Sequence, residues 1–185
     1  MPLQKRTTKL MITQDTIDRV PCIRLFEFTT EEEKFIQHLH KEVLIYAMNK
    51  NESNEVGILV DMRTWESILI KGNRNSIDMG NSERARELLK TAPNRSLIFL
   101  HNHPNNTIFS SNDLRSFCAN ESLFMMTAIC NNGNIHVLAK GFNFSPAAVM
   151  LAHNKGVSEN KGIQNMIKQS RHLGVLYKFG RCRKK

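Results

Sequence analysis

The fold and the chemistry of this chain are both decided by residues 96–113, which read SLIFLHNHPNNTIFSSND. The apolar letters at the start predict a buried strand that ends in His101 and His103. Residues two apart on a strand point to the same face, so both imidazoles can converge on one ion. Pro104 lacks a backbone donor and ends the strand. The loop that follows leads to a predicted helix start, where Asp113 can add an oxygen ligand.

Two imidazoles and one carboxylate form a donor set suited to zinc, and they leave a fourth tetrahedral position for water. Such an ion lowers the pKa of its water to about 7 and polarises a carbonyl group. We therefore predict one Zn²⁺ per chain, held by His101, His103 and Asp113. An alternative stays open at the helix start. Ser110 to Asp113 has the spacing of a helix capping box, and either Ser110 or Ser111 could act only as an N-cap.

The other histidines have weaker claims to bind a metal ion. His38 and His40 also stand two apart, but on a predicted helix, where they are separated by about 200° and cannot chelate together. Three more histidines are isolated in the sequence, namely His136, His153 and His172. We expect ordinary surface or packing roles for all five.

The flanking sequence alternates between helical and strand patterns. Helices are expected over 30–48, 82–90, 113–120, 146–154 and 158–170, and strands over 56–61, 67–70, 96–100, 123–130 and 134–139. The first helix has a capping-box spacing from Thr30 to Glu33. Asn131, Asn132 and Gly133 form an Asn-Gly turn typical of a hairpin. Interleaved elements of this kind favour a layered α/β domain. We divide the chain into an N-terminal extension (1–30), this domain (31–160), and a basic C-terminal helix and tail (161–185).

The positive charge of the chain is concentrated at its C-terminal end. The net charge is +9, yet the last acidic residue is Glu159. Residues 1–160 are nearly neutral, with 18 basic against 17 acidic residues, because eight of the 26 Lys and Arg residues follow position 160. Nucleic acid or another acidic partner could bind residues 161–185. The alternative is a solvated terminus that only aids solubility.

Composition and cysteine usage predict a cytoplasmic protein with no membrane partner. No apolar run approaches the roughly 20 residues that cross a bilayer, and no secretory signal is recognisable at the start. The four cysteines, Cys22, Cys118, Cys130 and Cys182, are widely scattered and form no CxxC pair. Reduced thiols are therefore expected.

Residues 101–113 carry His-x-His-Pro, a short loop and then Ser-x-x-Asp, which resembles the JAMM signature of the MPN/JAB metallopeptidases. A wider resemblance from about 55 to 141 is closest to the bacterial RadC-like branch of that family. It comprises an apolar strand led by Glu55 and ended by Asp61, a turn at Lys71 and Gly72, a helix, and a strand leading into His-Asn-His-Pro. The resemblance implies a three-layer α/β/α fold of the cytidine-deaminase-like type. It also implies that the protein is located in a bacterial-type cytoplasm.

The resemblance also implies roles for individual residues. His101, His103 and Asp113 match the zinc ligands, Glu55 the glutamate that activates the water, and Ser110 the serine that stabilises the tetrahedral intermediate. The implied reaction is hydrolysis of peptide or isopeptide bonds in a protein or peptide substrate, ubiquitin-like conjugates among them. Two other bases remain open, Glu42 on the preceding helix and Glu66 beside the second strand. Glu55 is favoured because it opens a strand of the sheet that should also bear the histidines.

Several competing functions lack their motifs. A zinc deaminase needs HxE and PCxxC, a zincin needs HExxH on a helix, and an HNH nuclease spreads its residues over a ββα unit. None of these patterns occurs in the chain. The alternative from a different class is a RadC-like module that binds DNA or protein through its basic tail, without catalysis.

Overall fold

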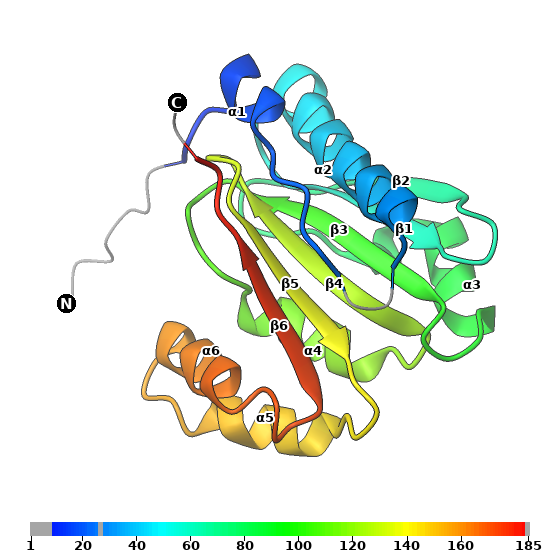
Figure 1. Ribbon diagram of the computed structural model, residues 1–185, viewed down its shortest axis with the longest axis vertical. Helices are drawn as coiled ribbons and strands as arrows, with labels where there is room; N and C mark the ends of the chain where they lie inside the picture. The colour runs from blue at the N-terminus through cyan, green and yellow to red at the C-terminus, as the bar shows by residue number, and fades with distance from the viewer. Residues whose placement is uncertain (1–8, 26–27, 184–185) are drawn as a thin grey trace.

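The computed structural model describes residues 9–25 and 28–183. Its centre is a six-stranded sheet (Figure 1). The strands are β1 (Val56–Asp61), β2 (Ser67–Lys71), β3 (Leu97–His103), β4 (Leu123–Cys130), β5 (Ile135–Lys140) and β6 (Val175–Gly180). They lie in the order β2-β1-β3-β4-β5-β6. The β3–β4 pair is parallel and the other four pairs are antiparallel. The mixed α/β class predicted from the sequence is therefore confirmed.

Helices cover both faces of the sheet. They are α1 (Gln14–Asp18), α2 (Thr30–Lys50), the 3₁₀ turn η1 (Met79–Asn81), α3 (Glu83–Thr91), α4 (Ser111–Ala119), α5 (Pro146–Asn154) and α6 (Glu159–Lys168). On one face Leu44 of α2 packs in the same core as Leu100 of β3. On the other face Phe117 of α4 shares a core with Phe99, the preceding residue of β3. The two cores follow from the alternation of side chains along each strand.

The N-terminus of α2 differs by one residue from the sequence prediction. Thr29, not Thr30, is the N-cap, and it forms a capping box with Glu32. Glu33 is buried instead, and its Oε1 accepts a hydrogen bond of 2.6 Å from the backbone N–H of Leu25. Glu33 thus holds the N-terminal segment against the helix, which leaves the capping role to the preceding threonine and glutamate.

Both ends of the described chain contribute to the core, and this differs from the division expected from sequence. Ile12, Ile17, Val20 and Leu25 are buried in the core under α2, so residues 9–25 are more than an extension. At the other end, β6 pairs with β5 along its whole length and completes the sheet. The expected basic tail therefore includes a strand of the domain.

Two further features bear on the sequence predictions. All four cysteines are free. The described part of the chain contains no helix long and apolar enough to span a bilayer.

Candidate metal centre

The two histidines at the end of β3 lie in a space left by small neighbours. His101 is fully buried and His103 nearly so. His101 pairs with Gly57 on one side and with Ala128 on the other, both of which leave room for its ring. A Cβ atom at Gly57 would lie 2.6 Å from the Phe99 ring, which itself stacks on His101 with centroids 5.2 Å apart.

Asp113 is brought to the histidines by the first turn of α4. Ser110 is the N-cap, and its Oγ accepts a hydrogen bond of 3.1 Å from the backbone N–H of Asp113. The backbone N–H and the hydroxyl of Ser110 each donate to Asp113 Oδ2 at 2.7 Å. Ser110 is thus the helix cap, as one sequence alternative proposed, and the same hydrogen bonds orient the carboxylate of Asp113.

The three candidate ligands converge on one point. His101 Nε2 and His103 Nε2 lie 3.0 Å apart. Asp113 Oδ1 lies 3.4 Å from His101 Nε2, and Oδ2 lies 3.2 Å from His103 Nε2. All three side chains are buried, and together they could hold a metal ion. Among the described residues, this is the one group of three or more His, Cys, Asp or Glu side chains that could hold a metal ion.

The surroundings of the two imidazoles also suit metal binding. Nδ1 of His103 lies 3.2 Å from both the carbonyl and the hydroxyl of Thr107. When the Nδ1 proton is donated to that carbonyl, the lone pair of Nε2 faces the cluster. A hydrogen bond of this kind orients the ring of a histidine that binds a metal ion. Nδ1 of His101 is, among the described residues, the single buried side-chain polar atom without a hydrogen-bond partner. This atom is not the one that faces the cluster, which is Nε2, and the backbone of Thr127 acts through a hydrogen bond to raise the pKa of His101.

The charges within the cluster are strongly coupled. Burial opposes ionisation of Asp113, but His101 and His103 hold its pKa well below the ordinary value. Burial and the neighbouring His103 lower the pKa of His101 although Asp113 acts in the opposite direction. Burial also works against a charged His103, yet Asp113 and Glu55 raise its pKa. A metal ion binds a neutral imidazole, so metal binding and protonation of His103 oppose each other.

Glu55 lies immediately before β1 and beside this cluster. Its backbone is fixed by hydrogen bonds of 2.9 Å to Asn73 and from Gly72, and by one of 2.8 Å from Asn51 Nδ2. Glu55 precedes Gly57 by two residues and so shares the sheet face of His101. Burial raises its pKa to about 8, with His103 acting to lower it and Asp113 to raise it.

The other two candidate bases lie elsewhere. Glu42 is exposed on α2, which covers the opposite face of the sheet from α4. Glu66 is exposed and forms an ion pair of 3.6 Å with Arg84. Neither contributes to the pKa of the histidines or of Asp113.

A buried asparagine between the two histidines received no role from the sequence. Asn102 Oδ1 accepts from the backbone N–H of Val56 at 2.7 Å, and its Nδ2 donates to Asn54 O at 3.2 Å and to Asn131 Oδ1 at 2.8 Å. Asn102 therefore fixes the backbone on both sides of Glu55 relative to β3. The signal that could have revealed it was an uncharged polar residue inside an otherwise apolar strand.

The remaining described histidines supply no ligand to the cluster, although His103 is close enough to His136 to act in lowering its pKa. His38 is exposed, while His40 is buried and contacts Thr127 Oγ1 at 2.8 Å. His136 contacts the hydroxyl of Tyr177 at 2.9 Å, and His153 contacts the hydroxyl of Ser111 at 3.0 Å. These contacts agree with the packing roles expected from sequence.

Compared with protein-family models, curated proteins and solved structures, the chain matches none.

Proposed function

We propose that this chain is a zinc-dependent hydrolase of peptide or isopeptide bonds, built on a JAB/MPN-type three-layer α/β/α fold. The spacing of the candidate ligand atoms carries the proposal. Tetrahedral zinc with bonds of roughly 2.0–2.1 Å holds its ligand atoms about 3.3 Å apart. The two Nε2 atoms lie 3.0 Å apart, and Asp113 approaches His101 through Oδ1 at 3.4 Å and His103 through Oδ2 at 3.2 Å, so each pair of side chains is close to this spacing.

Glu55 would act as the general base of this reaction. With a pKa of about 8, Glu55 keeps its proton at neutral pH in the metal-free chain. A cation bound at the neighbouring cluster would favour the ionised carboxylate, which is the form that accepts a proton. It would take the proton from the attacking water and pass it to the leaving amine. When bound, the zinc ion would acidify that water and polarise the scissile carbonyl.

Ser110 would stabilise the developing oxyanion. Its hydroxyl donates to Asp113 in this structure, so it has to rotate toward the substrate oxygen in order to contribute. Its backbone N–H would continue to hold the carboxylate of Asp113 during that rotation.

The first test is the metal content of the purified chain, measured by mass spectrometry without chelators. We expect about one zinc ion per wild-type chain and a sharp loss in Asp113→Ala and His103→Ala. His38→Ala is the matched control, because it removes an exposed histidine from the other HxH pair and should keep its zinc. Absence of metal in folded wild type, even after zinc is added, would refute the site. Iron bound in place of zinc would instead indicate an oxygenase, because non-haem iron oxygenases bind their metal ion through two histidines and one carboxylate.

The second test separates metal binding from catalysis. Glu55→Gln should retain zinc and lose hydrolysis of peptide and isopeptide-linked probes. Glu66→Gln is the control and should retain both. Full activity in Glu55→Gln would remove Glu55 from the mechanism while leaving the metal centre intact.

A further inference from the structure

The turn that leads into Glu55 has an unusual backbone conformation. Glu52 and Ser53 have positive φ angles of 51° and 58°, in the left-handed region that residues other than glycine rarely adopt. Two such residues in succession persist only where surrounding contacts impose the conformation, and conformations of this kind cluster at functional sites. The contacts that hold this turn therefore also decide where Glu55 lies.

Asn131, in the turn between β4 and β5, holds this turn from inside the protein. Its side chain is almost fully buried, with the residue 1% exposed. Its Nδ2 donates to the carbonyl of Ser53 at 3.0 Å and to that of Leu10 at 2.7 Å, and its Oδ1 accepts from Asn102 Nδ2 at 2.8 Å. One amide group thus joins the turn before Glu55, the N-terminal segment and β3. The sequence indicated only an Asn-Gly turn at this position.

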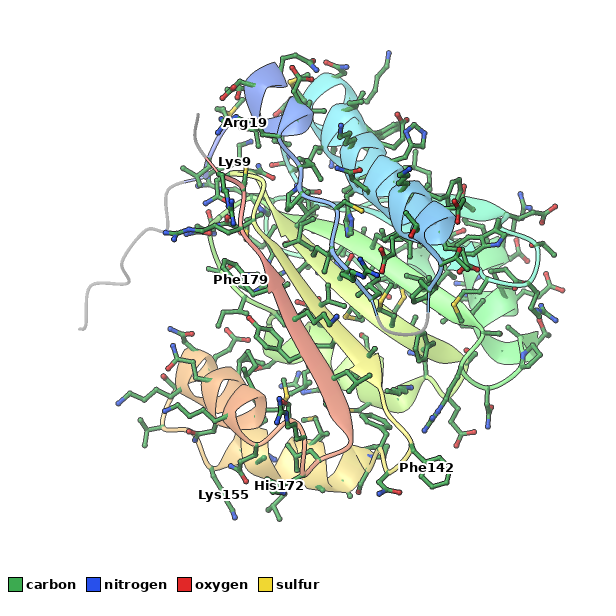
Figure 2. The ribbon with its side chains drawn as sticks, in the orientation of Figure 1. Lys9, Arg19, Phe142, Lys155, His172 and Phe179 are labelled. Carbon is green, nitrogen blue, oxygen red and sulfur yellow. The ribbon has the colours of Figure 1, made fainter. Side chains whose placement is uncertain are left out.

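The N-terminal segment also contacts the turn directly. We call residues 9–12 the N-terminal strap. Lys9 Nζ donates to the carbonyl of Glu52 and, at 3.1 Å, to Asn54 Oδ1. Figure 2 shows Lys9 at the end of the sheet where β4 and β5 are joined. A single lysine therefore bonds to one of the two left-handed residues and to the residue immediately before Glu55.

The backbone of the N-terminal strap supplies two more hydrogen bonds. The N–H of Leu10 donates to the carbonyl of Pro104 at 2.8 Å. The N–H of Ile12 donates to Ser53 Oγ at 3.3 Å, and the side chain of Ile12 is buried in the core under α2. The strap is thus bonded to the turn that precedes the proposed base and to the residue that follows the second histidine of β3.

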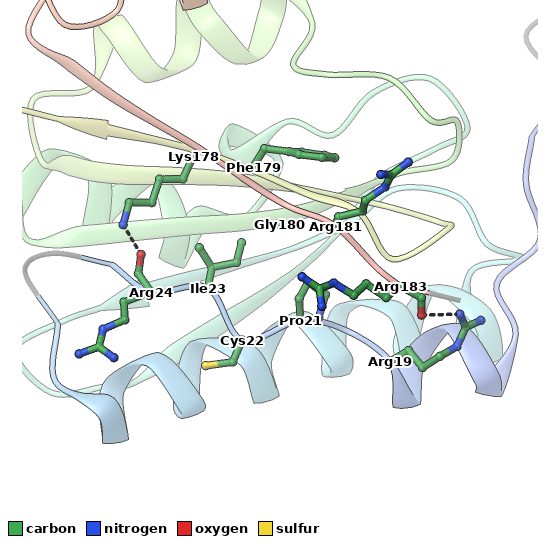
Figure 3. A pocket seen from close by; sticks show the side chains of 10 residues that line it. All are labelled: Arg19, Pro21, Cys22, Ile23, Arg24, Lys178, Phe179, Gly180, Arg181 and Arg183. Atoms are coloured by element: carbon green, nitrogen blue, oxygen red, sulfur yellow. Dashed lines mark hydrogen bonds between the residues drawn. The ribbon is translucent and has the colours of Figure 1, made fainter. Parts of the chain in front are cut away.

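The N-terminal segment is also fixed to the domain beyond the strap. Arg19 Nη1 donates to the carbonyl of Arg183 at 2.9 Å, and Lys178 Nζ donates to the carbonyl of Arg24 (Figure 3). These contacts lie outside the turn and the metal centre. Substitutions within the strap should therefore disturb the turn without releasing the whole segment.

We propose that Lys9 and Asn131 are positioning residues, which hold the turn before Glu55 so that its carboxylate can act on the attacking water. This inference rests on the proposed hydrolase function. Neither residue belongs to the candidate ligand set, whose members are carried by β3 and α4. Displacement of the turn should therefore move the base and leave the ligands in place.

The kinetic test measures hydrolysis and zinc content in full-length Lys9→Met and Asn131→Ala. Displacing a catalytic group by about 1 Å can cost about 100-fold in rate. We expect kcat to fall roughly 10-fold in Lys9→Met and about 100-fold in Asn131→Ala, with KM and one zinc ion per chain retained. Lys9→Arg keeps a donor and should restore most of kcat. Lys155→Met is the control, because it removes an exposed lysine at the opposite end of the molecule (Figure 2).

A double variant separates positioning from a general loss of stability. In the Glu55→Gln background, Asn131→Ala should cause no further loss of the residual activity, because its effect passes through Glu55. Equal losses in both backgrounds, or loss of zinc in step with kcat, would overturn the positioning role. Thermal melts establish folding, and Lys9→Met decides the outcome if Asn131→Ala does not fold.

Amide hydrogen exchange tests the hold on the turn without any substrate. The backbone N–H groups of residues 53–56 are hydrogen-bonded in the folded chain. They should exchange at least about 10-fold faster in Lys9→Met and Asn131→Ala, while those of β3 keep their protection. Unchanged exchange at 53–56 would overturn the proposal even if the chain hydrolyses peptides. A zinc-loaded wild type that cleaves no probe would refute the proposed function and the catalytic role of the strap, and faster exchange would then show a structural hold alone.

Discussion

Replacing Glu55 by glutamine should stabilise the metal-free chain, and increasingly so as the pH rises. Burial raises the pKa of Glu55 from an ordinary 4.5 to about 8, so the folded chain retains a proton that the unfolded chain releases. Between these two pH values the folded state binds more protons than the unfolded state. The free energy of unfolding therefore falls as the pH rises through this window. Glutamine stays neutral and removes this dependence.

The size of the effect follows from the two pKa values. Each tenfold change in acidity is worth about 1.4 kcal/mol, so a pKa raised from 4.5 to about 8 corresponds to roughly 5 kcal/mol when Glu55 is fully ionised. Glu55 as a residue is only 8% exposed, so solvent screening reduces this figure modestly. We expect 3–5 kcal/mol near pH 9, about 10 °C in melting temperature for a chain of this size, and little difference near pH 5.

Urea unfolding of metal-free wild type and Glu55→Gln at about pH 5, 7 and 9 measures this difference. His103, whose pKa is also raised, loses its contribution to stability as the pH rises, so the wild-type profile alone is not sufficient. The informative quantity is the gap between the two profiles. Glu66→Gln, at an exposed position, should leave the profile unchanged. Parallel profiles for wild type and Glu55→Gln would show that Glu55 ionises freely, and its assignment as a poised base would fail.

Three further substitutions test the support of the metal centre. Ser110→Ala removes the helix cap and one hydrogen-bond donor to Asp113. The free energy of unfolding in urea should fall by about 1 kcal/mol, and the zinc affinity measured by chelator competition should fall roughly 10- to 100-fold. Unchanged zinc affinity would contradict the orienting role of Ser110. Asn102→Ala leaves two buried partners without hydrogen bonds and should cost roughly 2–5 kcal/mol in the same unfolding assay; a loss below about 1 kcal/mol would mean that water replaces the amide. Gly57→Ala places a methyl group against Phe99 and should cost about 1–3 kcal/mol, whereas a neutral result would show that β1 shifts to make room.

Local patterns in the sequence were sufficient for much of the secondary structure around the site. The predicted bounds of β1, β4 and α5 agree with the structure, because each element carries its own apolar run and stop signals. The placement of His101 and His103 on one face follows from strand alternation alone. Asp113 could be added because the loop after Pro104 leads to a predicted helix start, and the structure has a capping box between Ser110 and Asp113 there.

Contacts between distant segments decided the rest. The sequence did not predict α1 or β6, since each is short and is stabilised by packing against other parts of the chain. The N-cap of α2 is Thr29 and not the predicted Thr30, because the carboxylate of Glu33 accepts a hydrogen bond from the backbone of Leu25. The hydrogen bonds of Asn102 join β1, β3 and the turn after β4. The N-terminal segment likewise meets the C-terminal part of the chain through hydrogen bonds between residues more than 150 positions apart. Periodicity and caps act over a few residues along the chain, whereas pairing of remote segments depends on burial and hydrogen bonding that exist only in the folded protein.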